Sequence, residues 1–416
     1  MINQSMNLLQ YLNIIIPGLW LTAGFLVVDG IGLALLPRLG ISYGGVAPTL
    51  AAFVFLRGGL VFLWLLLQAW LAQIGATALQ KRSIWILVAL NLVLLGVAFD
   101  AFYVEPMQLT VGRIEVPLPG LSHSVRIVQL TDIHVERTTR REQALPGLVE
   151  SLHPDMIVLT GDYLNQSFSH DAQAAADLRL LLGRLHAPLG IYAVNGNVET
   201  PLEMGDLLAG LDIRPLNNEV LRIPALGDHF ALVGLNYTDW LFDQIELHFL
   251  MQQVKAGDFS LLLYHTPDQA YAARGLGVNL YLAGHTHGGQ VTLAGLHELA
   301  LGKIGGHRYV HGLYGSRGHK GAEAGGHGRA RTEGGKRVGE GAVYVGAGIG
   351  AAVIPLRIGD RGKREVTIFE LGAEPGSFAE HHAEQEAMPG RKPSKALMAK
   401  RAAKVVRKRI MRERNR

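Results

Sequence analysis

The sequence predicts an α/β domain preceded by a small domain of membrane-spanning helices. The first observation behind this prediction is three long, nearly uncharged apolar stretches within residues 1–104. The second is a change beyond residue 105, where short apolar runs alternate with turns and helical segments, a pattern typical of α/β domains. The third is that several of these runs end in Asp, Asn or His. We therefore expect a helical anchor, residues 1–104, followed by a catalytic domain, residues 105–371.

Composition limits the chemistry that this chain can carry. Its 416 residues leave room for roughly two to three domains. A hydrophobic content of 49% is high for a purely soluble enzyme, and the excess lies in the first 104 residues. The chain contains no cysteine, which excludes disulfides and thiolate metal sites. Any bound metal must therefore be held by nitrogen and oxygen ligands.

The apolar stretches cover residues 14–36, 46–79 and 84–104. A bilayer core requires about 20 helical residues, so the first and third stretches each predict one span. The second is longer and is interrupted at Arg57, and we expect one tilted or kinked span there. Asp29 and Arg57 fall at membrane depth. They either form a functional pair or make a hydrated contact inside the helix bundle that has no catalytic role.

The charges flanking the spans bear on orientation. No Lys or Arg precedes the first stretch, which favours an uncleaved anchor over a signal peptide. Lys81 and Arg82 follow the second stretch, whereas only Arg38 lies between the first two. Positive charge favours the cytoplasm, so the catalytic domain is expected outside the cytoplasm. A cytoplasmic catalytic domain stays open as the alternative.

Five predicted strands of the second domain end in potential metal ligands. The strands fall near residues 125–130, 155–159, 190–194, 261–264 and 278–283, and the side chains that follow them are Asp132, His134, Asp162, Asn197, His265, His285 and His287. Ligands of open α/β sheets collect at the carboxyl ends of strands. Seven N/O donors suit two divalent ions that share a carboxylate, for which Asp162 is placed. Such a pair suits hydrolysis of a phosphoester or phosphoanhydride by a bridging hydroxide.

The ordered motifs resemble those of the calcineurin-like metallophosphoesterases, particularly their membrane-associated bacterial branch. They read Asp-x-His, Gly-Asp, Gly-Asn-x-Glu, a strand-end His and Gly-His-Thr-His-Gly-Gly-Gln at residues 284–290, and the resemblance covers residues 122–371. It implies a four-layer fold, in which two β-sheets pack face to face between helices. It also implies that residues 341–346, 351–358 and 364–371 are closing β-segments.

The resemblance further implies the assignment of the ligands. Its first metal site would comprise Asp132, His134, Asp162 and His287. Its second would comprise Asp162, Asn197, His265 and His285. The catalytic residues would be Asp132, Asp162, Asn197 and His265, and the cofactors would be two divalent ions, with Mn, Fe, Zn and Mg all acceptable to these ligands. Tyr163, Asn165 and Glu199 follow the motifs closely enough to line the cleft.

One position departs from the family. Its motif usually reads Gly-Asn-His-Asp/Glu, and the His is thought to protonate the leaving group, but this chain has Val198. Loss of a general acid typically costs roughly 10²–10⁴-fold for a leaving group that needs a proton. We therefore expect a phosphoanhydride or an activated diester as substrate, or a proton from another group. The alternative is a catalytically weak membrane protein with a binding or regulatory role.

Two further regions lie outside the predicted core. Residues 315–341 form a Gly-rich insertion. Its His319 and His327 are expected to be solvated, and an approach of these side chains to the metals is the alternative. Residues 372–416 form a linker and tail, and residues 391–416 hold 12 Lys and Arg against one Glu. No aromatic residue lies among these charges, so a lipid surface is favoured over nucleic acid as the partner. A merely solvated tail remains the alternative.

These predictions combine into one hypothesis. The chain is a membrane-anchored dinuclear metal-dependent phosphoesterase, and its expected partners are the lipid bilayer and a phosphate-containing substrate, for which a lipid-linked phosphate is one candidate. We expect it in the bacterial inner membrane. The sequence does not indicate its oligomeric state.

Overall fold

The computed structural model describes residues 8–40, 46–118, 121, 124–290, 309–314, 341–352, 357–358, 363–373 and 379–380. These residues divide into two compact units, a helical unit that ends at Met107 and a catalytic unit that begins at Gln108. Residues 315–340 of the predicted insertion, with His319 and His327, lie outside the described residues, as does almost all of the linker and tail, residues 374–378 and 381–416.

The helical unit contains three helices that are long and apolar enough to cross a membrane, the number that the sequence predicts. They are α1 (Leu8–Leu35), α2 (Val46–Gln73) and α3 (Thr77–Phe99). The second apolar stretch forms the single helix α2 up to Gln73, and its last residues, 77–79, begin α3. After α3 the chain continues through the π-helical turn η2 (Asp100–Val104) and the 3₁₀ turn η3 (Glu105–Met107).

A buried polar cluster joins all three of these helices. The guanidinium of Arg57 on α2 donates to both carboxylate oxygens of Asp29 on α1, at 2.5 and 2.7 Å. It also donates to the side-chain oxygen of Asn91 on α3, at 2.7 Å. Arg57 is 0% exposed. Asp29 and Arg57 are therefore paired with each other and satisfied by hydrogen bonds, as buried charges require.

The catalytic unit contains two β-sheets in its described residues. The first has the order β13-β1-β12-β2-β3-β4-β5. Its strands are β1 (Leu109–Pro117), β2 (Val125–Leu130), β3 (Met156–Leu159), β4 (Ile191–Ala193), β5 (Arg214–Pro215), β12 (Arg364–Ala373) and β13 (Ala379–Glu380). The second has the order β10-β11-β9-β8-β7-β6. Its strands are β6 (Glu219–Arg222), β7 (Phe230–Gly234), β8 (Phe259–Leu263), β9 (Leu280–Ala283), β10 (Gly312–Tyr314) and β11 (Ala342–Val345).

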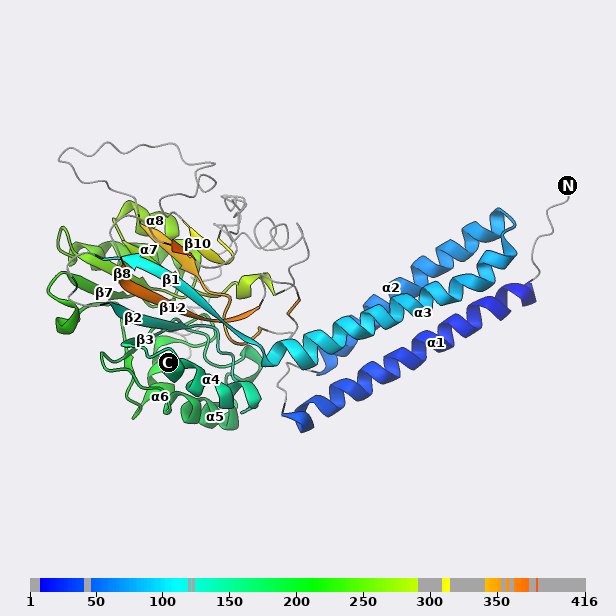
Figure 1. Ribbon diagram of the computed structural model, residues 1–416, viewed down its shortest axis with the longest axis horizontal. Helices are drawn as coiled ribbons and strands as arrows, with labels where there is room; N and C mark the ends of the chain where they lie inside the picture. Colours follow the sequence, from blue (N-terminus) through cyan, green and yellow to red (C-terminus); the bar gives the residue numbers. More distant parts are fainter. Residues whose placement is uncertain are drawn as a thin grey trace, which may run out of the picture. The chain divides into compact units, whose positions relative to one another are not determined.

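The two sheets pack face to face and helices cover their outer faces (Figure 1). Apolar residues of both sheets form the shared core, among them Ile127 and Val158 from the first sheet and Leu261 and Leu282 from the second. The helices α4 (Arg140–Ser151), α5 (Ala172–Leu182) and α6 (Pro201–Leu208) cover the first sheet. The helices α7 (Trp240–Gln252) and α8 (Ala270–Gly275) cover the second. The predicted four-layer fold is confirmed.

One β-segment differs from the expectation. Among the described residues of 351–358 only Ile358 takes part in β-pairing, as a single bridge, and its N–H donates to the carbonyl of Gln290 at 2.7 Å. The backbone there turns toward the loop that follows β9, so it cannot extend a ladder. In contrast, β11 and β12 cover the other two predicted closing segments.

Candidate metal centre

The seven predicted ligands lie together where five strands end. Asp132 and His134 follow β2, Asp162 follows β3, and Asn197 follows β4. From the second sheet, His265 follows β8, and His285 and His287 follow β9. Parallel strands end at the same edge of a sheet, and the two sheets face each other. Side chains up to 155 residues apart in sequence, from Asp132 to His287, therefore converge on one small region.

The first group of ligands comprises Asp132, His134 and His287, whose ligand atoms lie within 4.8 Å of one another. The Nε2 atoms of the two histidines are 3.2 Å apart. The Nε2 of His287 lies 3.4 Å from Oδ1 of Asp132. All three side chains are buried. Two imidazole nitrogens and a carboxylate oxygen aimed at one small volume are a donor set that suits a divalent cation.

The second group comprises Asp162, His265 and His285, again with ligand atoms within 4.8 Å of one another. Asn197 belongs beside them, because its Oδ1 lies 2.9 Å from Nε2 of His265 and 2.7 Å from Nδ1 of His285. Asp162 connects the two groups. Its Oδ2 lies 3.4 Å from Nε2 of His265 and 3.6 Å from Nε2 of His134.

Hydrogen bonds orient two of the histidines as metal ligands are usually oriented. The Nδ1 of His265 lies 2.8 Å from the carbonyl oxygen of Thr160, and the Nδ1 of His134 lies 3.2 Å from that of Leu164. A carbonyl oxygen can only accept, so each Nδ1 carries the proton. Once Nε2 is unprotonated, each ring presents its Nε2 lone pair to the centre, which is the arrangement that a bound cation needs.

His287 is held differently. A guanidinium nitrogen of Arg357 lies 3.2 Å from its Nδ1, and a guanidinium can only donate. A neutral His287 then carries its proton on Nε2, which faces the Nε2 lone pair of His134. A cation bound at this nitrogen would displace that proton. Arg357 is fully buried, and no sequence pattern pointed to it.

The backbone of the ligand loops is strained. Eight described residues other than glycine have a positive φ angle, and five of them are predicted ligands: Asp132, His134, Asp162, His285 and His287. Such conformations cost of order 1–3 kcal/mol each and concentrate at functional sites, where the surrounding structure enforces them. The backbone strain lowers the local stability of the loops, and it sets the direction in which these side chains point.

Glycines allow the loops to approach the carboxylates. A Cβ atom at Gly196 would overlap the backbone nitrogen and carboxylate of Asp162. A Cβ atom at Gly284 would overlap the side chains of Thr131 and Asp132. Thr131 also donates from Oγ1 to Oδ2 of Asp132, at 2.7 Å. The glycines of the motifs are thus required by close packing.

Burial and neighbouring charges shift the pKa values of the ligands in different directions. Burial opposes ionisation of Asp162, but His265 and His134 outweigh it and hold the pKa of this carboxyl below its ordinary range. Burial also disfavours the charged form of His265, yet the carboxylate of Asp162 raises the pKa of this imidazole to about 10. Burial lowers the pKa values of His134 and His287, which keeps both rings neutral and able to coordinate.

Glu199 ties two ligand loops together. Its carboxylate accepts from the backbone N–H groups of Asp162 at 2.9 Å, Gly196 at 2.6 Å and Tyr163 at 3.4 Å. Burial, and then the neighbouring Asp162, raise the pKa of Glu199 to about 7. The side chains of Tyr163 and Asn165 make internal contacts. The hydroxyl of Tyr163 donates to the carbonyl of Val194 at 2.7 Å, and the side-chain amide of Asn165 donates to Glu136 at 2.9 Å and to the carbonyl of Ala351 at 3.1 Å.

Sequence reasoning missed a loop behind the first ligand group. The N–H of Gly350 donates to the carbonyl of Asp132 at 2.6 Å, and the N–H of Ile349 donates to that of Thr131 at 3.1 Å. The side chain of Arg364 in turn donates to the carbonyl of Ile349 at 2.9 Å. The signal that could have found this loop is its composition, Gly-Ala-Gly-Ile-Gly at residues 346–350.

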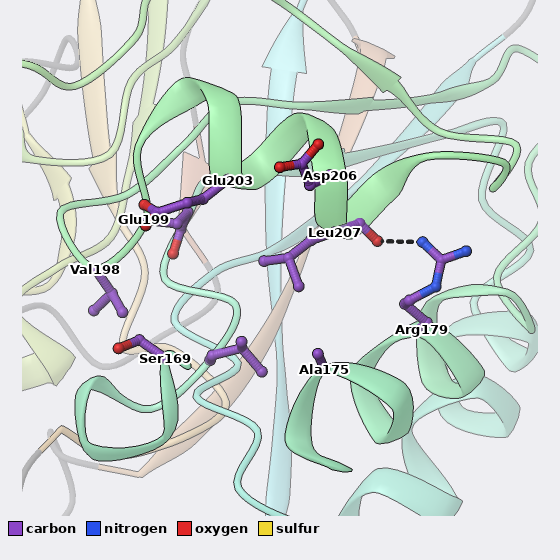
Figure 2. A pocket seen from close by; sticks show the side chains of 9 residues that line it. Ser169, Ala175, Arg179, Val198, Glu199, Glu203, Asp206 and Leu207 are labelled. Atoms are coloured by element: carbon purple, nitrogen blue, oxygen red, sulfur yellow. Dashed lines mark hydrogen bonds between the residues drawn. The ribbon is translucent and has the colours of Figure 1, made fainter. Parts of the chain in front are cut away.

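A cavity of about 300 Å³ adjoins the centre between α5 and α6. Figure 2 shows Val198 and Glu199 at one end of it and Arg179 at the other, where its guanidinium donates to the carbonyl of Leu207 at 2.7 Å. Val198 also donates its backbone N–H to Oδ1 of Asp162, at 3.0 Å. The position at which the resemblance implies a proton donor thus holds an apolar side chain facing a cavity.

Comparisons with known proteins agree with this geometry. Residues 125–289 match the model of the calcineurin-like phosphoesterase family. A transmembrane protein with metallophosphoesterase domain from Bos taurus is 33% identical over 204 residues, which cover 44% of this chain and 45% of that protein. An uncharacterized metallophosphoesterase of Bacillus subtilis (strain 168) is 26% identical over 281 residues, covering 65% of this chain and 88% of that protein.

A third relative is a UDP-2,3-diacylglucosamine pyrophosphatase of Chlamydia muridarum (strain MoPn / Nigg). It is 34% identical over 102 residues, which cover 23% of this chain and 30% of that protein. The chain thus spans about half or less of the bovine and chlamydial relatives.

Proposed function

Because this chain carries a calcineurin-like phosphoesterase domain at residues 125–289, we propose that it is a membrane-anchored, metal-dependent hydrolase of phosphodiester or phosphoanhydride linkages. The observation that carries the proposal is the convergence of seven N/O donors in two groups around Asp162. The donor set contains no sulfur, which suits Mn, Fe, Zn or Mg.

The residues present fit two divalent cations. Asp132, His134, Asp162 and His287 would hold the first. Asp162, Asn197, His265 and His285 would hold the second. When bound, such cations supply Lewis acidity toward phosphate oxygens and lower the pKa of water. The chain itself contributes the orientation of the imidazoles, through the carbonyls of Thr160 and Leu164, and the rigid spacing of the loops, through Glu199.

The side chains beside the centre favour a leaving group that needs no proton. Val198 has none to donate. Both carboxylate oxygens of Glu199 accept backbone N–H groups, so this acid is engaged away from the substrate. A phosphoanhydride releases a phosphate, which is already a stable anion. The diphosphate linkage in the name of the chlamydial relative supports the same substrate chemistry, and its acylated sugar supports a lipid-linked substrate.

The three apolar helices support an integral membrane location, and we place it in the bacterial inner membrane. The charges at Lys81 and Arg82 favour a catalytic domain outside the cytoplasm. A lipid-linked phosphate fits this anchoring, because confinement to one surface raises the frequency of encounter.

The test uses the full-length chain in detergent with Mn²⁺ and bis-p-nitrophenyl phosphate as reporter. The Asp162→Asn variant removes the shared charge, and we expect it to lose hydrolysis and at least one bound ion by metal analysis. Asp258→Asn is the matched control, because Asp258 is also buried but pairs with Arg222, at 2.5 Å, instead of with the centre. Full activity in Asp162→Asn would refute the proposal.

A second candidate function is a binding or regulatory role with little turnover. Val198 favours it, because the proton donor that the family resemblance implies is missing. The same experiment separates the two candidates. Two bound ions per chain without hydrolysis of diesters or diphosphates would favour the regulator.

A further inference from the structure

The chain enters the first sheet from α3 at one edge of that sheet. The metal ligands lie at the same edge. Strand β1 runs parallel to β12, and β12 runs antiparallel to β2. The first residue of β1, Leu109, pairs with Arg364. Since Thr367 pairs with Gln129, continuing that register places Arg364 opposite Asp132. Leu109 and Asp132 therefore lie two strand spacings apart, about 10 Å.

A chain of hydrogen bonds connects these two positions. Thr110 donates from Oγ1 to the carbonyl of Arg364 at 2.8 Å. The side chain of Arg364 donates to the carbonyl of Ile349, and the next residue, Gly350, donates its N–H to the carbonyl of Asp132. The start of β1 and the first metal ligand are thus parts of one rigid edge.

Chain length then limits how far the centre can lie from the bilayer. The third candidate span ends at Met107, two residues before Leu109. Two residues reach at most about 7 Å. Asp132 therefore lies within about 20 Å of the last residue of that span. This bound follows from connectivity and register alone, and it holds for every orientation of the two units.

The same end of the domain exposes large apolar side chains. A helix that follows a strand begins at the carboxyl edge of the sheet. At their starts, α6, α7 and α8 carry Leu202, Leu241, Phe242 and Tyr271, which are 74, 44, 52 and 77% exposed. We call these four residues the rim set. Hydrogen bonds between Tyr237, which precedes α7, and Asn195, which precedes the ligand Asn197, join the starts of α6 and α7 to the centre.

Exposed charges of both signs lie at the same end of the domain. Arg140 begins α4, after the loop from His134, and Lys363 immediately precedes β12, while Glu203 follows Leu202 and Asp268 precedes α8, and all four are exposed. Exposed apolar residues together with Lys and Arg occur on surfaces that lie in the headgroup layer of a bilayer. Apolar side chains at such a surface reach the acyl boundary while the cations meet phosphates.

From the short tether and the rim set together, we propose that the metal-binding end of the catalytic unit rests on the bilayer that anchors the chain, and that the centre takes phosphate linkages from its headgroup layer. This inference rests on the proposed hydrolase function for its substrate, but the docking surface itself does not require turnover.

The first experiment measures docking without activity. The chain lacks cysteine, so Leu202→Cys and Ala225→Cys each accept one spin label. Ala225 is exposed in the turn before β7, at the opposite end of the sheet, and serves as the control. The full chain is placed in vesicles of phosphatidylglycerol and phosphatidylcholine that contain a nickel-chelating lipid. We expect relaxation enhancement at residue 202 and little at residue 225. Equal enhancement, or none at residue 202, overturns the proposal.

The second experiment tests the tether. A rigid helical insert of about 15 residues between Met107 and Gln108 lifts the domain by about 22 Å. The control carries the same insert after Gly227, in an exposed turn at the far end. Both are assayed with Mn²⁺ on diacylglycerol diphosphate in the vesicles and on soluble bis-p-nitrophenyl phosphate. We expect the lifted variant to lose at least about tenfold on the lipid and to keep its activity on the soluble ester.

The outcomes of this second experiment separate the two proposals. Unchanged hydrolysis of the lipid by the lifted variant overturns the bilayer-facing arrangement and leaves the hydrolase intact. A wild-type chain that cleaves the soluble ester but not the vesicle lipid also overturns the headgroup substrate. If the wild-type chain cleaves neither substrate, the proposed hydrolase function is refuted. The spin-label experiment then tests docking on the bilayer by itself.

Discussion

Val198 is the residue that most limits the chemistry of the candidate centre. It follows the ligand Asn197 and donates its backbone N–H to Asp162, so its side chain starts from the edge of the centre. We predict that Val198→His will raise kcat/KM for alkyl monophosphates by about 10²–10⁴-fold, since an imidazole there can protonate an alkoxide leaving group. Hydrolysis of diphosphates should change little, because their leaving group needs no proton.

The control for this substitution is Val198→Asn, which is polar and of similar size but a poor acid. Steady-state kinetics on both substrate classes distinguish the variants. A Val198→His enzyme with the monophosphate activity of the wild type would show that the missing proton donor does not set the substrate preference.

At the residue level, the candidate metal ligands could be predicted from the sequence better than the side chains that contact them. The seven candidate ligands follow strands whose apolar runs are visible in the sequence, and the structure brings all seven together. Their role as metal ligands stays a prediction. Thr131 and Arg357 were missed for a physical reason. Their contacts with Asp132 and His287 depend on how loops pack, and Arg357 lies 70 residues beyond the histidine that it touches.

Helix α4 shows how an element supports the centre. It begins soon after His134, with a capping box in which Glu142 accepts from the N–H of Thr139 at 3.0 Å. Glu142 also pairs with Arg141, its Oε1 accepting from the Nε at 2.8 Å. Burial opposes ionisation of Glu142, but Arg141 and Thr139 outweigh it and hold its pKa below the ordinary value of 4.5. The ionised carboxylate therefore stabilises the folded state.

We predict that Glu142→Gln will lower the free energy of unfolding by about 1–3 kcal/mol at pH 7, because a buried charged hydrogen bond is lost. The folded-state pKa lies below the unfolded one, so this stabilisation is complete above pH 4.5 and is lost as pH falls through the folded-state pKa. Denaturant unfolding at pH 7 and at successively lower pH measures it.

The matched control for that prediction is Glu203→Gln, in the exposed capping box of α6. Surface positions usually change stability by no more than about 0.5 kcal/mol. A Glu142→Gln variant as stable as this control at pH 7, or one whose deficit grows on acidification, would contradict the assignment.

The membrane helices depend on the Asp29–Arg57 pair in a testable way. We predict that Arg57→Leu alone will destabilise the helical unit by about 3–5 kcal/mol, because it leaves a buried carboxylate without its cation. The double variant Asp29→Leu/Arg57→Leu should recover most of that loss, because it leaves no unpaired charge. Unfolding of the full chain in detergent, analysed as a double-mutant cycle, gives the coupling energy. Additive losses would show that the two residues act independently.

The number of long helices was predicted better than their ends. The stretches 14–36, 46–79 and 84–104 correspond to α1, α2 and α3, whose ends differ from the predicted ones by up to about seven residues, and the predicted strand at residues 364–371 became β12. The described residues of 351–358, namely 351, 352, 357 and 358, hold a single β-bridge and not the expected strand. Their short apolar run cannot by itself distinguish a strand from a loop that turns back to Gln290.

At the scale of the whole molecule, the side of the membrane can be tested because the chain has no cysteine of its own. Ser151 is exposed at the end of α4, and Thr77 is exposed at the start of α3, next to Lys81 and Arg82. We predict that Ser151→Cys will react with a membrane-impermeant maleimide in intact cells. Thr77→Cys should react only after permeabilisation, because positive loops stay in the cytoplasm.

The reverse labelling pattern would place the catalytic domain in the cytoplasm. The margin in the sequence is only two basic residues against one, which is why charge alone could not decide it. The sheet order was also beyond the sequence, since pairing of β1 with β12 joins residues more than 250 apart.

The candidate ligands come from both sheets. Asp132, His134, Asp162 and Asn197 follow strands of the first sheet, and His265, His285 and His287 follow strands of the second. An ion held there would link the two sheets. Separating the sheets would first require release of the ion, so the free energy of unfolding would rise with the logarithm of the free metal concentration. The increase is about 2.7 kcal/mol when that concentration is a hundredfold above Kd. In a cell that lacks this metal, the folded protein would be less stable, and its lifetime would then depend on the metal supply.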